Sequence, residues 1–398
     1  MYNVDNNINY NVKLINKIAK VGIDVFDTEK YTVSEDAEAP VALMVRSAKL
    51  HDTVFDKETI AIARAGAGVN NIPCDRCAEE GIVVFNTPGA NANGVKELTL
   101  AAMMLAARDV VGGIAWAEAL EKDSEVAAKV EKGKGQFAGS ELLGKTVGVI
   151  GLGAIGGLVA NACVSLGMKV IGYDPHLSVI AAWNLSGSII RAESYDDIYA
   201  KSDYITLHIP ALPTTKGIIN SESIAKMKKG VKIINLARGE LVNVADLKAA
   251  LESGAVSKYV TDFPSDDTIG TAGIINIPHL GASTEESEDN CAVMAANQLC
   301  EFIEYGNIKN SVNYPAVSIP VSASTLKGAR IGICHRNVAN MIAGIAGRIS
   351  AAGLNIEHMA NGSRGEYAYT LIEAGAQMPQ SVAEAIKVMD GIISVRII

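Results

Sequence analysis

The segment Thr146–Gly157, with the sequence TVGVIGLGAIGG, constrains this chain more than any other. Its apolar run Val147–Ile150 predicts a buried strand. The run ends at three glycines spaced as G-x-G-x-x-G, which are Gly151, Gly153 and Gly156. In such a segment the first glycine makes a tight turn, the second admits a pyrophosphate, and the third lets the following helix pack on the strand. The N–H groups of that helix, expected over 155–164, would face the phosphates. A purely structural turn is the alternative.

A second expected strand, 169–173, ends at Asp174, which lies 18 residues after Gly156. At an offset of about 20 residues, an acidic side chain accepts the ribose hydroxyls of NAD. Its negative charge would repel the 2′-phosphate of NADP, and Pro175 stands where a phosphate-binding Arg would be needed. The two segments together predict a dinucleotide site that prefers NAD.

The composition of the chain narrows its class. A length of 398 residues suits two or three domains, and 49% hydrophobic with 20% charged residues predicts packed cores rather than disorder. The net charge of −9 argues against broad binding to nucleic acids or to anionic membranes. The polar start Met1–Asn11 and the lack of an apolar run of about 18 residues favour a cytoplasmic protein.

The first ninety residues predict a small α/β unit, because three apolar runs each end in a polar or glycine-rich loop. The runs are 41–45, 60–64 and 82–85, and the loops that follow them begin at Arg46, Ala65 and Asn86. Ligands of parallel sheets gather beyond the carboxyl ends of the strands, so these loops are candidates for one edge of a site. Arg46 carries a fork that suits anions, although a strand-end Arg can simply be solvated.

The pattern of strands and helices continues around the glycine motif. A long helix is expected over 96–120 and an exposed crossover over 122–135. Further strands are expected at 204–208, 231–236, 259–263 and 274–277, which is the rhythm of a doubly wound parallel sheet. A helix is expected over 286–305.

Residues 313–324 have the composition of a linker, and a compact unit follows from residue 329. Its expected order is strand 330–335, helix 340–352, strand 355–359, turn 362–365, strand 367–373, helix 381–388 and strand 392–397. This βαββαβ order predicts a four-stranded antiparallel sheet with two helices on one face.

A nicotinamide site needs a group that moves the hydroxyl proton and a group that holds the substrate. His279, at a strand end, is the best candidate for the base, because imidazole titrates near neutral pH; a capping or core histidine is the alternative. Asp266 or Asp267 is placed by sequence to hold its tautomer. Arg238 can clamp a carboxylate through two hydrogen bonds.

The order of these segments resembles the D-isomer-specific 2-hydroxyacid dehydrogenases, from about residue 40 to 310. In that family the Arg of A-R-G binds the substrate carboxylate, the His of P-H-x-G is the acid/base, and a Glu pairs with it. The resemblance assigns these roles to Arg238, His279 and Asp266. The chain departs from the pattern because the acid is an Asp, is followed by Asp267 rather than Pro, and sits on a shorter loop, so Asp267 remains a substitute.

The expected cofactor contacts follow from the motif and the strand ends: Gly151, Gly153, Ala154, Ile155, Gly156, Asp174, His208, Ile209, Pro210, Leu236, Ala237, Asp262, Gly281 and Ala282. The three N-terminal loops resemble those of family members that oxidise 3-phosphoglycerate, in which the Arg of V-R-S approaches the phosphate. The expected substrate contacts are Arg46, Ser47, Ala65, Gly66 and Asn86.

The tail 328–398 resembles an ACT domain, an amino-acid-sensing module. His335, Asn337 and Asn355 match positions that bind serine in regulated members. The chain departs from the pattern of these members because the usual R-P-G is replaced by Val338-Ala339-Asn340.

We therefore expect a Rossmann-type doubly wound parallel sheet inserted in a flavodoxin-like substrate domain, followed by an ACT domain. The expected boundaries are 1–91 and 285–315 for the substrate domain, 92–284 for the NAD domain, 316–327 for the linker and 328–398 for the ACT domain. The expected reaction is oxidation of 3-phosphoglycerate, the first step of L-serine synthesis, by a homodimer or homotetramer without a metal. Two alternatives remain: a dehydrogenase of glyoxylate or hydroxypyruvate, and a non-catalytic NAD-sensing protein.

Overall fold

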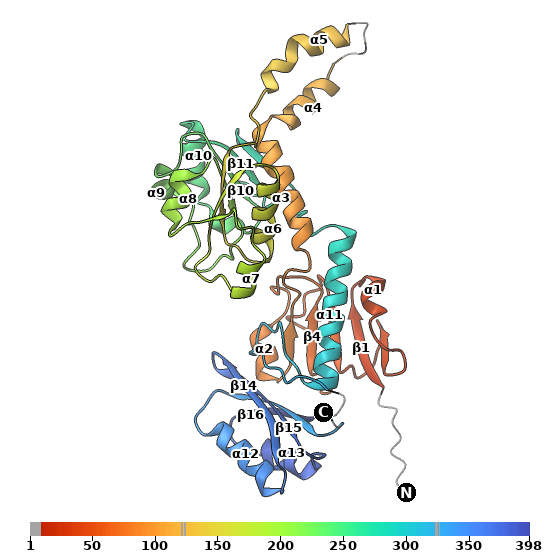
Figure 1. Ribbon diagram of the computed structural model, residues 1–398. Helices are drawn as coiled ribbons and strands as arrows, with labels where there is room; N and C mark the ends of the chain where they lie inside the picture. The colour runs from red at the N-terminus through yellow and green to blue at the C-terminus, as the bar shows by residue number, and fades with distance from the viewer. Residues whose placement is uncertain (1–8, 121, 123–124, 323–324, 326) are drawn as a thin grey trace. The chain divides into compact units, whose positions relative to one another are not determined.

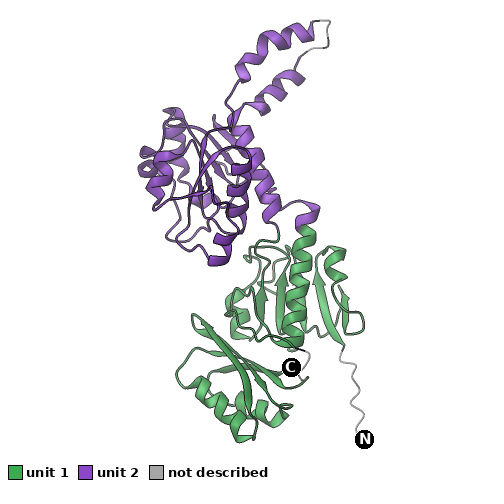
Figure 2. Cartoon of the chain, in the orientation of Figure 1, with its two compact units in different colours: residues 1–90, 288–398 green, residues 91–287 purple. Residues whose placement is uncertain are grey.

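A computed structural model describes residues 9–120, 122, 125–322, 325 and 327–398 of the chain (Figure 1). It divides into two compact units (Figure 2). Unit 1 comprises Met1–Ala90 and Glu288–Ile398, and unit 2 comprises Asn91–Ser287. Of the polar start Met1–Asn11, only residues 9–11 are described, and residues 323, 324 and 326 of the predicted linker also lie outside the described residues.

Unit 1 contains a five-stranded parallel sheet in the order β2-β1-β3-β4-β5. Its strands are β1 (Tyr10–Ile15), β2 (Tyr31–Ser34), β3 (Ala42–Val45), β4 (Ala61–Arg64) and β5 (Val83–Phe85). Short helices α1 (Lys20–Ile23) and α2 (Cys74–Glu79) lie in the connections. The sequence indicated the three strands that are buried throughout. It did not indicate β1 and β2, because they lie in a polar segment in which β1 buries only Val12 and Leu14 and the edge strand β2 buries only Tyr31.

The strands of this sheet bury both faces. Leu43, Val45 and Ile62 belong to one apolar cluster. Met44 and Ala63 face the other side, where they belong to a cluster that includes the long helix α11 (Glu285–Tyr305). Because neighbouring residues of a strand point to opposite faces, burial on both sides produces the continuous apolar runs seen in the sequence.

Unit 2 contains a seven-stranded parallel sheet in the order β12-β11-β10-β9-β6-β7-β8, with the switch in strand order beside β6. The strands are β6 (Thr146–Ile150), β7 (Lys169–Tyr173), β8 (Ile190–Arg191), β9 (Tyr204–Leu207), β10 (Val231–Asn235), β11 (Val256–Thr261) and β12 (Ile274–Asn276). The helices are α3 (Ala92–Ala107), α4 (Val110–Glu118), α5 (Val126–Gly133), α6 (Ala154–Ser165), α7 (Val179–Trp183), α8 (Tyr195–Lys201), α9 (Ser221–Ala225) and α10 (Val244–Glu252), with 3₁₀ turns η1 (Lys134–Phe137) and η2 (Gly239–Leu241). The predicted fold class is confirmed.

The predicted helix 96–120 is wrong in one respect, because it is two helices. α3 ends before Arg108, which is extended, and α4 begins after Asp109, whose side chain accepts a hydrogen bond from the N–H of Gly112 (3.1 Å). A carboxylate that caps a new helix offers the backbone an alternative to continuing the first one. The predicted crossover 122–135 contains the helix α5. Residues 123 and 124 of the crossover are outside the described residues.

The C-terminal subdomain, residues 328–398, forms a four-stranded antiparallel sheet in the order β14-β15-β13-β16. Its elements are β13 (Arg330–Arg336), α12 (Met341–Ala351), β14 (Ile356–Arg364), β15 (Tyr367–Ala374), α13 (Gln380–Lys387) and β16 (Ile392–Ile397). The predicted βαββαβ order is confirmed, and β14 runs through most of the predicted turn to meet β15 in a tight hairpin at Gly365.

One face of this sheet packs on α12 and α13, and the opposite face joins the cluster around α11. Three side chains of the sheet bind carbonyls at the end of α11: Arg396 those of Phe302 and Ile303 (both 2.6 Å), Arg330 that of Tyr305 (3.2 Å) and Tyr369 that of Gly306 (2.8 Å). The carbonyls at the end of a helix lack some of their helical partners, and these donors bind them there; that of Phe302 also accepts the N–H of Gly306 (2.9 Å). Arg330 is 1% exposed and also pairs with Glu373 (Nε to Oε2, 2.6 Å).

Among the described helices, none is long and apolar enough by itself to cross a membrane. α3 and α4 reach that length and composition only as a pair bent by 72°.

Candidate active site

The glycine-rich loop joins β6 to α6 in unit 2. Gly151 has φ of +88°, and a Cβ there would lie 2.5 Å from the carbonyl oxygen of His208. A Cβ on Gly156 would lie 1.9 Å from the carbonyl oxygen of Gly151, so both positions require glycine. A Cβ on Gly153 would meet no atom within 4 Å, and no side chain caps α6, which begins at Ala154. Open space beside the uncapped start of a helix suits a pyrophosphate.

Asp174 is held against this loop. Its Oδ2 accepts a hydrogen bond from the N–H of Leu152 (2.9 Å), and its Oδ1 accepts one from the N–H of His176 (2.8 Å). The carboxylate therefore lies at the end of β7, next to β6, where the ribose of a dinucleotide is bound in folds of this kind.

The glycine-rich loop also packs against the residues that follow β9. The ring of His208 is partly buried, and its Nε2 lies 2.9 Å from Oγ1 of Thr206. Burial lowers the pKa of His208 to about 4, so its imidazole is neutral at physiological pH. Ile209 and Pro210 follow His208. A Cβ on Gly151 would lie 2.7 Å from Cγ2 of Ile209.

Arg238 follows β10 on a turn that the buried residue Asn235 organises. Asn235 donates from Nδ2 to the carbonyl of Arg238 (2.8 Å) and to the hydroxyl of Tyr259 (3.0 Å). Its Oδ1 accepts hydrogen bonds from the N–H groups of Ala237 (3.2 Å) and Arg238 (3.3 Å). The side chain of Arg238 is exposed, and its Nη1 bonds the carbonyl of Ala237 (2.7 Å). The sequence assigned no role to Asn235, and its position inside the motif was the only signal.

Asp262, at the end of β11, is 1% exposed, and its Oδ1 has no hydrogen-bond partner among the described residues. Burial raises the pKa of this carboxyl, while the charge of His279, the N–H of Gly281 and the charge of Arg238 oppose the rise. A buried carboxylate oxygen without a donor costs free energy unless a ligand supplies one, and the carboxamide NH₂ of a nicotinamide is such a donor. The site therefore fits NAD in two ways: by the glycine cradle and by this oxygen.

His279 lies after β12 and is exposed; its ring contacts that of Phe263 with centroids 4.7 Å apart. Asp266 and Asp267 are exposed on a turn closed by the N–H groups of Thr268 and Ile269 bonding the carbonyl of Ser265 (2.9 and 3.1 Å). Within the described ranges, no hydrogen bond or ion pair joins His279 to either aspartate, and Asp262 is the carboxyl whose pKa responds to His279. The expected dyad thus stays a prediction.

The expected substrate loops lie in unit 1, at the ends of β3, β4 and β5. Arg46 forms a two-point ion pair with Glu288 of α11, in which Nη1 donates to Oε2 at 2.8 Å and Nη2 donates to Oε1. Arg64 braces two of the loops, because its Nε donates to the carbonyl of Arg46 (3.0 Å) and its Nη1 donates to that of Gly68. Oδ1 of Asn16 accepts the N–H groups of Ser47 (3.3 Å) and Ala48 (2.7 Å). Neither Asn16 nor Glu288 carried a sequence signal.

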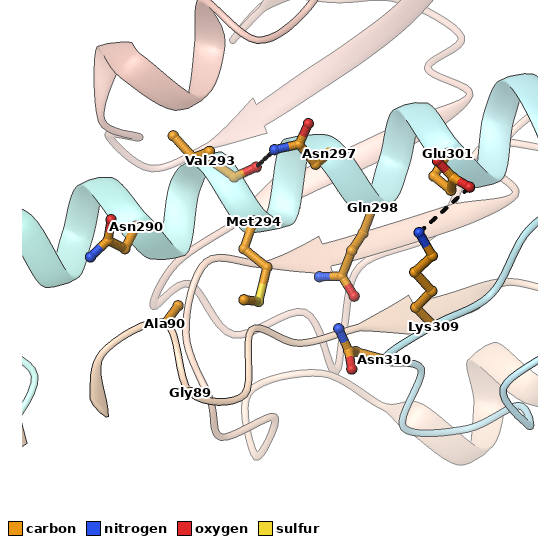
Figure 3. A pocket seen from close by; sticks show the side chains of 10 residues that line it. All are labelled: Gly89, Ala90, Asn290, Val293, Met294, Asn297, Gln298, Glu301, Lys309 and Asn310. Carbon is orange, nitrogen blue, oxygen red and sulfur yellow. Dashed lines mark hydrogen bonds and ion pairs between the residues drawn. The ribbon is translucent and has the colours of Figure 1, made fainter. Parts of the chain in front are cut away.

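A cavity of about 730 Å³ lies in unit 1 between α11 and the loop after β5 (Figure 3). It is lined by Gly89, Ala90, Asn290, Val293, Met294, Asn297, Gln298, Glu301, Lys309 and Asn310. Gln298 points from α11 toward the loop, and its Nε2 donates to the carbonyl of Asn86 (2.9 Å). The cavity thus borders the backbone that carries Asn86, and the loop is tied to α11.

The three expected effector residues lie in the C-terminal subdomain. His335 is 2% exposed; its Nδ1 lies 2.8 Å from the carbonyl of Arg336 and its Nε2 2.8 Å from Oγ1 of Thr370. Asn337 is exposed, with Nδ2 bonded to the carbonyl of Gly365 (3.2 Å), and Asn355 is exposed as well. The two asparagines are therefore accessible in this chain, whereas both ring nitrogens of His335 are engaged.

Across the described residues, no group of three or more His, Cys, Asp or Glu side chains is arranged to hold a metal ion.

Comparison with known proteins places these features in a family. Residues 100–281 match the family described as "D-isomer specific 2-hydroxyacid dehydrogenase, NAD binding domain". The chain is 33% identical over 314 residues to D-3-phosphoglycerate dehydrogenase of Methanocaldococcus jannaschii, covering 77% of this chain and 58% of that protein. It spans roughly half the length of the curated relatives it matches.

The solved structures that resemble the chain include two dehydrogenase-type enzymes. The NAD⁺-bound 3-phosphoglycerate dehydrogenase of Entamoeba histolytica is 26% identical, with a TM-score of 0.59 over 77% of this chain and 99% of that one. A glyoxylate reductase from Paecilomyes thermophila is 25% identical, with a TM-score of 0.63 over 76% and 98%. The glycine cradle, Asp174 and the family match identify NAD as the cofactor. Unit 2 of the chain thus carries the NAD-binding domain of the D-isomer-specific 2-hydroxyacid dehydrogenase family.

Proposed function

We propose that the protein oxidises 3-phosphoglycerate to 3-phosphohydroxypyruvate with NAD, the reaction that opens L-serine biosynthesis. The observation that supports this most strongly is the gathering of Arg238, Asp262 and His279 at the ends of adjacent strands of the NAD-binding sheet. Parallel strands end at one edge, so a carboxylate clamp and a proton acceptor lie on the edge that binds the dinucleotide. The named relatives support a phosphorylated substrate.

His279 is the acid/base in this proposal. It takes the proton of the 2-hydroxyl, which leaves the C2 oxygen free to become a carbonyl, and it passes that proton to water afterwards. NAD supplies the acceptor for the hydride that leaves C2. Because His279 is exposed, its proton can exchange with solvent in each cycle.

Arg238 binds the substrate carboxylate and withdraws charge from the neighbouring carbonyl as it forms. Asn235 holds the backbone of Arg238 for this role. Asp266, or Asp267 in its place, stabilises the imidazolium of His279 after a movement of their exposed turn.

The substrate phosphate is bound by Arg46 on unit 1, with Ser47, Ala65, Gly66 and Asn86 lining the substrate. We propose a substrate domain formed by residues 1–91 and 285–315, an NAD domain formed by 92–284, and a linker over 316–327. The division of the chain after Ala90 and before Glu288 supports the proposed limits of the NAD domain.

Purified protein with NAD and a panel of 2-hydroxy acids tests this function. We expect NADH absorbance with 3-phosphoglycerate at a kcat/KM well above that for D-glycerate. Faster reduction of glyoxylate or hydroxypyruvate by NADH than of 3-phosphohydroxypyruvate would favour the reductase alternative. Binding of NADH without turnover of any acid would favour the NAD-sensing alternative.

We also propose that the protein is a homodimer or homotetramer. α4 contributes no buried residue to unit 2, and Val110, Val111 and Ile114 are 43%, 51% and 58% exposed on it. A helix with such a face is stabilised when a second copy covers it. Light scattering on the eluting protein gives the mass, and Ile114→Asp is expected to lower it.

The C-terminal subdomain is proposed to be an ACT domain with serine as its effector, bound by His335, Asn337 and Asn355. The order of its strands and the exposure of both asparagines support this. The buried hydrogen bonds of His335 give that residue a role in holding the loop of Asn337.

A further inference from the structure

Arg46, at the end of β3, forms an ion pair with Glu288 of α11. The carboxylate of Glu288 meets its guanidinium end-on through two hydrogen bonds, Nη1 to Oε2 at 2.8 Å and Nη2 to Oε1. Both side chains are partly exposed, 44% for Arg46 and 39% for Glu288. A carboxylate uses the same paired N–H groups of a guanidinium that a phosphate uses. The ion pair therefore occupies the donors that the proposed function assigns to the substrate phosphate.

The net charge near this ion pair bears on how well it can bind a phosphate. Arg46 pairs with Glu288 and its carbonyl accepts a hydrogen bond from Nε of Arg64, and the charges of all three residues influence the pKa of the buried Cys291 thiol, which burial raises. Arg64 is committed to the loop backbone through the carbonyls of Arg46 and Gly68. Two cations and one anion leave a single net positive charge, whereas a phosphate dianion carries two negative charges. Removing the charge of Glu288 would make the summed charge of these three groups equal and opposite to that of a phosphate dianion.

We propose that Glu288 is a specificity-determining residue: a built-in competitor that an incoming phosphate displaces from Arg46. This inference rests on the proposed function, because it concerns the phosphate of the same substrate. Inorganic phosphate and similar small anions gain too little from Arg46 alone to displace Glu288. A phosphorylated hydroxy acid displaces it because its carboxylate and hydroxyl are bound by other groups of the protein, which supply the remaining binding free energy.

The location of Glu288 suits this exchange. It lies in the first turn of α11, and its side chain is partly exposed, so it can rotate into water without leaving a buried charge unpaired. Leu299 and Ala296, further along α11, are fully buried, so the helix itself stays fixed while Glu288 moves. The free-energy cost of the exchange is therefore little more than that of breaking the ion pair.

Glu288→Gln tests the proposal, because Gln keeps the size and one acceptor oxygen but removes the charge. We expect calorimetry at low ionic strength to give a Kd for inorganic phosphate about fivefold to tenfold lower than in the wild type, which is the scale of one charge interaction near 4 Å at a hydrated surface. The gain should shrink with added salt. In Arg46→Ala/Glu288→Gln it should disappear.

Glu286→Gln is the matched control, because it makes the same change of net charge two residues earlier on α11, at an exposed position. It should leave phosphate binding unchanged. With 3-phosphoglycerate, Glu288→Gln should lower KM without raising kcat, and the KM for D-glycerate should not change.

The proposal is overturned if Glu288→Gln binds phosphate no more tightly than the wild type, or does not bind it detectably. A residue that only orients Arg46 would give that result. Calorimetry with inorganic phosphate needs no turnover. If the protein does not oxidise 3-phosphoglycerate but Glu288→Gln still binds phosphate more tightly through Arg46, the proposed function fails and this inference stands. If the protein oxidises 3-phosphoglycerate but Glu288→Gln binds phosphate no more tightly than the wild type, this inference fails and the proposed function stands.

Discussion

The carboxylate of Asp174 and the N–H of Leu152 form a 2.9 Å hydrogen bond across the glycine-rich loop. The acid that we expect to bind the ribose is therefore fixed to the loop that we expect to bind the pyrophosphate. One oxygen of Asp174 binds Leu152 and the other binds the N–H of His176, so the side chain is fixed before any cofactor arrives.

Asp174→Ala should weaken NAD binding and narrow the preference for NAD over NADP, because it removes both the ribose acceptor and the charge that repels the 2′-phosphate. Fluorescence titration with NADH and NADPH gives both constants. Asp174→Asn is the control that keeps an acceptor for the loop without the charge, and it should change the preference more than the NADH affinity. A wild-type protein that uses NADP as well as NAD would refute this role of Asp174.

His279→Ala should lower kcat by about 10²–10⁴-fold, the range for loss of a positioned proton carrier, while NADH affinity stays nearly constant. Steady-state rates and NADH titration measure the two quantities. His358→Ala, which changes an exposed histidine of β14, should leave both unchanged. Near-full turnover of His279→Ala would assign the proton transfer to another group.

Asp266→Asn and Asp267→Asn should differ in their effect, because only one of the two carboxylates can stabilise the imidazolium of His279. The variant that removes the partner should lower kcat and shift the acidic limb of the pH–rate profile to lower pH, since the imidazolium loses its counter-charge. Profiles of kcat from about pH 5 to 9 separate the two. Identical profiles for both variants and the wild type would exclude a dyad with either aspartate.

Arg46→Ala should lower kcat/KM for 3-phosphoglycerate by about 10²-fold or more and that for D-glycerate far less, because only the phosphate loses charge-assisted hydrogen bonds. Arg46→Lys keeps the charge but not the forked guanidinium, so its kcat/KM for 3-phosphoglycerate should lie between those of the wild type and Arg46→Ala. Kinetics with the two substrates decide the matter. Equal losses on both would mean that Arg46 serves the fold of the loop.

Acid should destabilise unit 2 through His208. Its pKa is about 4 in the folded protein against an ordinary value of 6.5, so between these values the unfolded chain binds a proton that the folded chain does not. This contribution to the free energy of unfolding is complete above pH 6.5 and falls as the pH is lowered toward 4, by at most about 2 kcal/mol between pH 7.5 and 5.0.

Urea unfolding followed by tryptophan fluorescence measures this loss, because both tryptophans, Trp116 and Trp183, belong to unit 2. His208→Gln should lose correspondingly less stability than the wild type over the same range. An equal loss in the two proteins would mean that His208 titrates normally.

Serine should inhibit the enzyme, and Asn337→Ala should abolish the inhibition while catalysis remains. A ligand changes turnover only if it binds two states of the protein unequally, so serine must favour the less active state. Gln380→Ala, at an exposed position on α13, is the control and should keep the inhibition. Calorimetry without heat for serine or related amino acids at millimolar concentration would leave the subdomain with a purely structural role.

Deleting the C-terminal subdomain is a poorer test. Arg330, Tyr369 and Arg396 bond the last carbonyls of α11, and Tyr369 and Leu371 are buried in the cluster of unit 1. Truncation would expose that cluster and remove those side-chain donors, so loss of activity would not report on the effector.

The sequence determined what depends on local backbone and periodicity. A positive φ at Gly151 and the contact between the backbone at Gly156 and the carbonyl of Gly151 admit no side chain at these two positions, so their spacing with Gly153 is enough to predict the loop. Buried parallel strands appear as apolar runs, and their ends supplied Arg46, Arg238, Asp262 and His279 as candidates. β1 and β2 could not be predicted in this way, because only one side of each is buried.

The tertiary structure decided which groups meet across long stretches of chain. Arg46 and Glu288 are 242 residues apart, and Arg396 finds the carbonyl of Ile303 at a separation of 93. No local pattern marks such pairs, because an exposed-looking Glu or Arg acquires a partner only when the sheet and α11 bring it there. Asn235 combines both kinds of contact: three of its hydrogen bonds join Ala237 and Arg238 in the same turn, and the fourth, to Tyr259, spans 24 residues and depends on the packing of the fold. Hydrogen bonds and ion pairs have ranges of a few ångströms, so their partners are set by the packing of the fold and not by order along the chain.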